Sequence, residues 1–130
     1  MVCLDTNFLI GIIRHDNDTK KKLISLRKSQ ATIFTTIINI AELYFGAYNS
    51  KYKSQGLSDV LAIKNSIQLL FFDEEAAEKY GMLASDPIIR SNKVNAEDLF
   101  IASIVLANNE EFITRDNDFS RIPNIKLSSW

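Results

Sequence analysis

The stretch ATIFTTIINIAELYFGAY, residues 31–48, changes from a strand pattern to a helix pattern. Residues 31–35 are rich in β-branched side chains and predict a buried strand. Residues 36–48 are strongly apolar and predict a helix. That helix carries one charged residue, Glu42, whose neighbours three and four positions away include Asn39 and apolar side chains. A carboxylate in such surroundings costs free energy unless a cation or hydrogen bonds compensate, so Glu42 is a candidate functional residue. The alternative is that Glu42 and Asn39 share a narrow solvent-facing strip.

The same alternation of strands and helices extends in both directions from this stretch. Strands are predicted at residues 2–4, 31–35, 69–72, 112–114 and 125–127. Helices are predicted at residues 8–13, 18–28, 36–48, 57–70, 74–84 and 95–107, with an interruption near Asp86 and Pro87. This order favours a three-layer α/β/α fold, in which a mostly parallel sheet of about five strands is covered by helices on both faces.

Length and composition are typical of one globular domain that spans residues 1–130. The single cysteine, Cys3, cannot form an internal disulfide. We find no signal peptide and no apolar run long enough to cross a membrane, so we expect a cytoplasmic protein. The net charge of −1 does not by itself indicate a nucleic-acid binder, although four metal-bound carboxylates would leave the rest of the chain basic.

Three more acidic residues follow strands or begin helices. Asp5 directly follows the first strand, Asp98 stands at the head of an apolar helix, and Asp116 follows the strand at 112–114. Each has an ordinary alternative explanation. Asp5 could cap a helix, Asp98 could close a capping box begun by Asn95, and Asp116 could be a turn residue.

The combination of these three acids with Glu42 predicts a metal site. Polar groups at the carboxyl ends of parallel strands meet at one edge of the sheet. Four carboxylates gathered there would repel one another unless cations lay between them. Ligation by oxygen alone suits Mg²⁺ or Mn²⁺ better than zinc, and such a site suits hydrolysis of a phosphodiester.

Four segments resemble the signature regions of PIN domains, in the same order. They are LDTN at residues 4–7, TTIINIAELYFGA at 35–47, DLFIA at 98–102 and ITRDNDF at 113–119. The ending RIPNIKLSSW, residues 121–130, is similar to that of many VapC toxins. The resemblance covers essentially the whole chain, and four motifs in order are specific.

The resemblance implies a Mg²⁺- or Mn²⁺-dependent endoribonuclease of the VapC toxin type, with a PIN-like fold. It implies cleavage by metal-activated water that leaves a 5′-phosphate and a 3′-hydroxyl. The implied catalytic and metal-binding residues are Asp5, Glu42, Asp98 and Asp116. The implied supporting residues are Asn7, Thr114 and Asp118, and the implied RNA contact is Arg115. The implied partners are an RNA substrate, a VapB-type antitoxin and a second copy of the chain.

Several alternatives stay open on the sequence. The chain could be a PIN-domain nuclease of RNA processing or decay that has no antitoxin, or an inactive PIN-like RNA-binding module. A Mg²⁺-dependent phosphatase is disfavoured, because the second aspartate that it needs two residues after Asp5 is replaced by Asn7. For the dimer, the aromatic residues Tyr44, Phe45, Tyr48 and Tyr52 recur at roughly helical spacing and form either an interface or part of the core.

Overall fold

A sheet of five parallel strands lies at the centre of the computed structural model, which describes all residues from 1 to 130. The strands are β1 (Val2–Leu4), β2 (Ile33–Thr36), β3 (Gln68–Leu70), β4 (Glu111–Ile113) and β5 (Lys126–Ser128). Their order across the sheet is β3-β2-β1-β4-β5. The expectation of a parallel sheet of about five strands is therefore confirmed.

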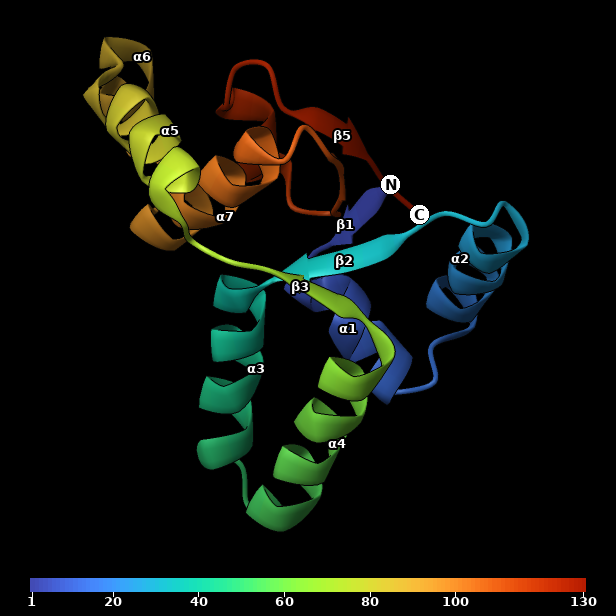
Figure 1. Cartoon of the computed structure of the whole chain (residues 1–130). Coiled ribbons are helices and arrows are strands. Elements are labelled where there is room, and N and C mark those ends of the chain that lie inside the picture. The colour runs from blue at the N-terminus through green and yellow to red at the C-terminus, as the bar shows by residue number, and fades with distance from the viewer.

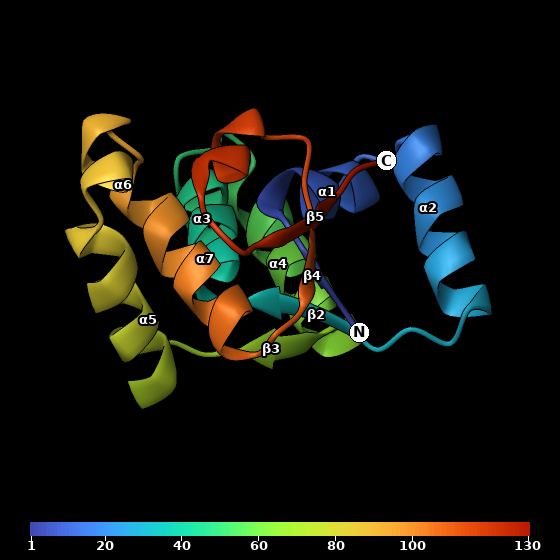
Figure 2. The ribbon, with the colours of Figure 1, turned by 90° about the horizontal axis from the view of Figure 1, so that it is seen from above.

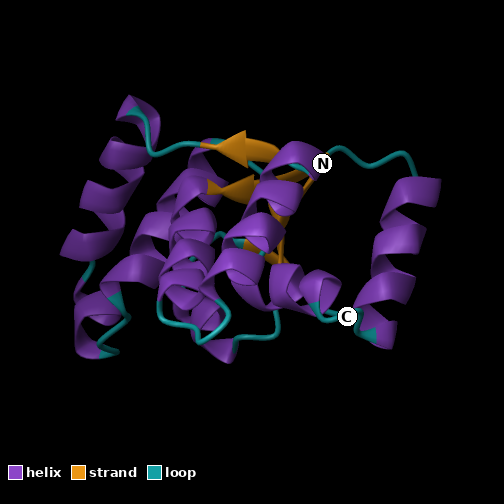
Figure 3. Ribbon diagram, turned by 90° about the horizontal axis from the view of Figure 1, so that it is seen from below, coloured by secondary structure: helices purple, strands orange, loops and turns teal.

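Helices cover both faces of the sheet (Figure 1). The first four are α1 (Thr6–Ile13), α2 (Asn17–Lys28), α3 (Ile37–Tyr48) and α4 (Lys53–Ser66). The last three are α5 (Glu74–Ser85), α6 (Pro87–Ser91) and α7 (Ala96–Ala107), and a short 3₁₀ helix, η1 (Asn117–Arg121), follows β4. Helix α2 stands at the edge of the molecule, next to the C-terminal residue (Figures 2 and 3).

The alternation of side chains along the strands divides the core into two clusters. Val2 and Leu4 of β1 pack with α1 to α4, whereas Cys3 between them packs with α5, α6, α7 and η1. The same alternation occurs in β4, where Ile113 belongs to the first cluster and Phe112 to the second. The three-layer α/β/α arrangement follows from this pattern. No helix is both long enough and apolar enough to cross a lipid bilayer.

The order of the strands creates a switch point between β1 and β4. The chain builds the sheet outward from β1 through β2 to β3, and then crosses to the other side of β1 to form β4 and β5. Ligands of open α/β sheets bind beyond the carboxyl ends of the strands at such a point. Asp5 follows β1 directly and Thr114 follows β4 directly, so both lie at this position.

Both boundaries of α4 differ from the expectation. A helix was expected at residues 57–70, but α4 begins at Lys53 and ends at Ser66. Residues 68–70 instead pair with β2, with Gln68 opposite Phe34 and Leu70 opposite Thr36. The strand expected at residues 69–72 therefore lies at residues 68–70, and its pairing with β2 ends the helix four residues earlier than the helical periodicity indicates. The expected break near Asp86 is confirmed, because Asp86 caps α6 and Pro87 occupies its first position.

Candidate active site

Asp5 is buried at the carboxyl end of β1, and both of its oxygens accept hydrogen bonds. Oδ1 accepts from the Thr6 backbone N–H at 2.8 Å and from Asn39 Nδ2 at 3.1 Å. Oδ2 accepts from Thr114 Oγ1 at 2.5 Å. Asp5 therefore caps α1 and also joins β1 to α3 and to the end of β4. Burial raises the pKa of its carboxyl group above the ordinary value, although these hydrogen bonds oppose the rise.

A network of hydroxyl and amide groups holds Glu42 next to Asp5. Asn39 forms a capping box with Thr36 at the start of α3, and its Nδ2 also donates to Thr6 Oγ1 at 2.9 Å. Thr6 Oγ1 donates in turn to Glu42 Oε2 at 2.8 Å. Asn39 is completely buried, so the proposed solvent-facing strip with Glu42 is wrong. Burial raises the pKa of Glu42, and the nearby charge of Asp5 adds to the rise.

Three carboxyl groups converge beside this network. One carboxylate oxygen from each of Asp98, Asp116 and Asp118 lies within 4.8 Å of the other two. Asp98 comes from the first turn of α7, and the other two come from the segment that follows β4. Burial, followed by the negative charges of the neighbouring acids, raises the pKa of Asp98 from 3.8 to about 6.

The capping box that the sequence suggested for Asp98 does not form. Asn95 caps α7 by accepting a hydrogen bond from the Glu97 backbone N–H at 2.7 Å. No reciprocal bond joins the Asp98 side chain to Asn95. Asp98 is therefore free to contribute its carboxylate to the cluster.

Thr114 connects the two groups of acids. Its hydroxyl donates to Asp5 and accepts a hydrogen bond from the Asp116 backbone N–H at 2.9 Å. Asp116 Oδ1 accepts from the Asp118 backbone N–H at 2.9 Å, which fixes the turn into η1. One threonine thus sets the position of the segment that carries Asp116 and Asp118 relative to β1.

The acid cluster has little positive charge to balance it. The one ion pair of the structure joins Arg121 to Asp118 at 3.9 Å, and both side chains are about half exposed. Asp5, Glu42 and Asp98 all have a raised pKa, with Asp116 among the causes in each case. A set of oxygen donors with excess negative charge fits a hard divalent cation such as Mg²⁺ or Mn²⁺.

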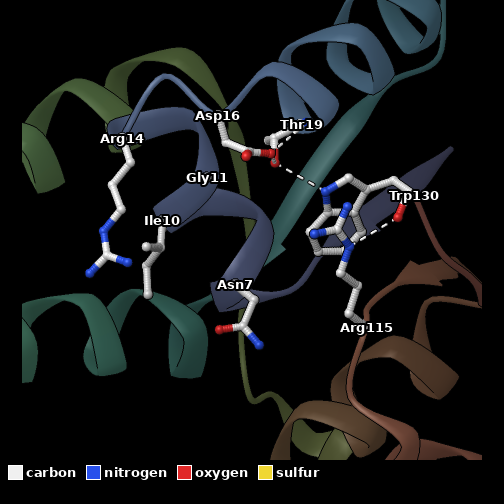
Figure 4. A pocket seen from close by; sticks show the side chains of 8 residues that line it. All are labelled: Asn7, Ile10, Gly11, Arg14, Asp16, Thr19, Arg115 and Trp130. Carbon is white, nitrogen blue, oxygen red and sulfur yellow. Dashed lines mark hydrogen bonds between the residues drawn. The ribbon is translucent and has the colours of Figure 1, made fainter.

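The supporting residues expected from the sequence fall into different places. Thr114 and Asp118 lie within the cluster, as described above. Asn7 is exposed and lines a separate pocket together with Arg115 (Figure 4). Sequence reasoning missed Thr6 and the amide of Asn39. The available signal was weak, since it consisted only of a hydroxyl next to Asp5 and an amide one helical turn before Glu42.

Comparisons with known proteins agree with this geometry. The sequence profile of the PIN domain matches residues 2–125. Ribonuclease VapC2 of Rickettsia felis is 30% identical over 98% of this chain and 96% of its own length. The tRNA(fMet)-specific endonuclease VapC of Salmonella typhimurium is 26% identical over the same shares of the two chains.

Solved structures show the same likeness. In the structure of VapBC2 from Rickettsia felis bound to a promoter DNA fragment, one chain superposes with a TM-score of 0.89 and 30% identity. The match covers 100% of this chain and 99% of that one. A chain of VapBC-1 from nontypeable Haemophilus influenzae superposes with a TM-score of 0.82 and 26% identity, over 100% of this chain and 98% of that one. The chain therefore belongs to the PIN-domain family and, within it, to the VapC ribonucleases. It is an endoribonuclease of the VapC type.

Proposed function

We propose that this endoribonuclease depends on Mg²⁺ or Mn²⁺ and acts in the cytoplasm as the toxin of a toxin–antitoxin pair, with the whole chain as one PIN domain. The observation that carries the proposal is the acid cluster at the switch point of the sheet. Asp98, Asp116 and Asp118 bring one oxygen each within 4.8 Å of the others, and Asp5 and Glu42 add their charges. A bound cation would offset both the burial and the repulsion between acids that raise the pKa of Asp98.

In this proposal the acids Asp5, Glu42, Asp98 and Asp116 bind the cation, and Asp118 assists them. The bound cation supplies positive charge that stabilises the phosphate oxygens and lowers the pKa of a water molecule. Thr114 and Asn39 orient Asp5 and favour its ionised form, because both donate hydrogen bonds to its carboxylate. Thr6 does the same for Glu42. The residues thus present charged oxygens in fixed positions before the substrate binds.

The experiment is to incubate the purified protein with RNA in Mg²⁺ or Mn²⁺, with and without EDTA. We expect cleavage that requires the cation and leaves 5′-phosphate and 3′-hydroxyl ends, as end-specific labelling of the fragments would report. Full activity in EDTA would exclude the metal mechanism. Binding of RNA without cleavage in any metal would instead favour an inactive RNA-binding module.

A VapB-type antitoxin and a homodimer complete the proposal. The two structures compared above are of VapBC assemblies, which supports a similar partner for this chain. For the dimer, Phe45, Tyr48 and Tyr52 are 74%, 60% and 78% exposed. Large apolar side chains grouped on a surface mark sites of association. Tyr44 of the same stripe packs inward, where its hydroxyl accepts a hydrogen bond from Lys64 Nζ at 3.1 Å.

A further inference from the structure

A polar pocket of about 390 Å³ lies between α1, the start of α2 and the C-terminal residue. Two arginines, Arg14 and Arg115, line it on opposite sides in Figure 4, and Asn7 lies between them. Two residues of the pocket are neighbours in sequence of acids at the active site. Asn7 follows Asp5 by two residues, and Arg115 stands directly before Asp116. The pocket is nevertheless separate from the carboxylates described above.

Neither arginine forms an ion pair with an aspartate or glutamate side chain. The one acid in the pocket, Asp16, already accepts hydrogen bonds from the Thr19 backbone N–H at 2.9 Å and from Thr19 Oγ1 at 2.8 Å. These bonds to Thr19 lower the pKa of Asp16, and the charge of Arg115 adds to the effect. The pocket thus carries two guanidinium groups against one acidic side chain, and an anion would find unpaired N–H donors there.

Arg115 is held in place by Trp130. Its Nε donates to the backbone oxygen of Trp130 at 2.9 Å, and its guanidinium carbon lies 4.2 Å from the centre of the indole ring. The indole Nε1 donates to Thr19 Oγ1 at 3.0 Å. The indole ring packs edge-on against the ring of Phe8, with 4.8 Å between the two ring centres. Because only Nε is used, both terminal nitrogens of Arg115 remain free. Such a fixed fork suits a phosphate group.

A second pocket, which includes Glu42, is mainly apolar and carries negative rather than positive charge. It lies between α3 and α7 and is lined by apolar side chains together with Glu42 and Glu97. Two carboxylates in apolar surroundings repel a phosphate backbone. A nucleic acid strand that crosses the acid cluster therefore continues more favourably into the pocket that holds Arg14 and Arg115.

We propose that this pocket binds a phosphate of the substrate RNA next to the scissile phosphodiester, with Arg14 and Arg115 as the phosphate ligands and Trp130 as the residue that positions Arg115. The inference rests on the proposed function, because it assumes that RNA occupies the acid cluster. Asn7 supplies an amide for the ribose or phosphate between the two arginines.

The test is RNA binding in EDTA, where the RNA stays intact, by fluorescence anisotropy with a short labelled single-stranded RNA. The variants are Arg14→Gln and Arg115→Gln, and the matched control is Arg27→Gln, an exposed arginine of α2 outside the pocket. We expect each pocket variant to weaken binding about tenfold and to reduce the slope of log Kd against log salt by about 0.7. The control should change both quantities much less.

Trp130 is the only tryptophan of the chain, so its fluorescence reports directly on this pocket. We expect unlabelled RNA to change the emission of the wild type, with a concentration dependence that matches the anisotropy. Arg14→Gln should require about tenfold more RNA for the same change. Arg14 is exposed and distant in sequence from Trp130, so this variant keeps the test valid even if Arg115→Gln disturbs folding.

The results of these experiments distinguish failure of the pocket inference from failure of the proposed nuclease function. If the wild type cleaves RNA and both pocket variants bind RNA like the Arg27→Gln control, the pocket inference is wrong and the nuclease stands. If the wild type cleaves nothing while the pocket variants lose RNA binding, the pocket stands and the nuclease proposal fails. Unchanged RNA binding with weakened antitoxin binding would assign the pocket to a protein partner and overturn the inference.

Discussion

Asp98 has the most strongly perturbed pKa among the carboxyl groups at the sheet edge. Its rise from 3.8 to about 6 means that the folded protein binds this proton more tightly than the unfolded chain does. The free energy of unfolding therefore falls as the pH rises from about 4 to about 6, and it stays lower above that range. Without a cation, the charge of Asp98 destabilises the fold at neutral pH.

We predict that Asp98→Asn abolishes cleavage and, in EDTA near pH 7, leaves the melting temperature equal or higher. The shift in pKa corresponds to about 3 kcal/mol, which solvent screening around a partly exposed side chain reduces to roughly 1 kcal/mol. A gain of about 3 °C is expected. The gain should disappear below about pH 3, where Asp98 is protonated in both states.

The control for this variant is Glu78→Gln, which removes an exposed charge in the middle of α5 and should change neither activity nor stability. A fall of several degrees in Asp98→Asn would mean that the carboxylate stabilises the start of α7. That result would count against repulsion within the cluster.

Single side chains show what the sequence could predict about the site. Asp5 and Asp116 follow strands, Asp98 begins a helix, and Glu42 interrupts an apolar helix, so local features of the sequence indicated all four acids. The hydrogen bonds from Thr6 and Asn39 were not predicted, because they join residues more than 30 positions apart. Their existence depends on how α3 packs against the start of α1.

The junction of α1 and α2 depends on close approach at Gly11. A Cβ placed on Gly11 would collide with Thr19 Oγ1, the atom that accepts the hydrogen bond from Trp130. In contrast, nothing lies within 4 Å of a Cβ placed on Gly81, which is exposed within α5. Substitution by alanine should therefore change the free energy of unfolding in opposite directions at these two glycines.

We predict that Gly11→Ala lowers the free energy of unfolding by about 2 kcal/mol, because two packed helices must separate. Gly81→Ala should raise it by about 0.5–1 kcal/mol, since alanine favours a helix over glycine. Urea denaturation measures both changes. Gly11→Ala should also alter the native fluorescence of Trp130, and equal stability of the two variants would refute the packing account.

The helices and strands were predicted best where the pattern was strong and local. The apolar helix expected at 36–48 is α3, Ile37–Tyr48, and the strand expected at 2–4 is β1. The start of α4 was missed because residues 53–56 are polar and its first turn lacks a side-chain cap. Its end was missed because pairing of β3 with β2 competes with the helix.

For the molecule as a whole, the exposed aromatic residues in the second half of α3 and directly before α4 predict association. We expect the double variant Tyr48→Ala, Tyr52→Ala to have a lower mass than the wild type by light scattering, because it loses apolar surface at the interface. It should also bind the antitoxin more weakly. Met82→Ala, which removes an exposed apolar side chain from α5, is the control and should behave as the wild type does.

A variant that stays folded, dimeric and fully inhibited by the antitoxin would place the interface elsewhere. In that case Tyr48 and Tyr52 would be ordinary exposed residues, and the dimer proposal would need another surface.

The proposed mechanism requires that the acids between β1, β4 and α7 hold a divalent cation. Its most direct test is calorimetric titration of Mn²⁺ into the metal-free wild type and Asp116→Asn near pH 7. Asparagine keeps the Oδ1 acceptor that caps η1, so this variant removes charge without removing the cap. We predict saturable binding to the wild type and at least about tenfold weaker binding to the variant, since a charged ligand is lost. Equal Mn²⁺ affinity in the two proteins would contradict the proposed metal site.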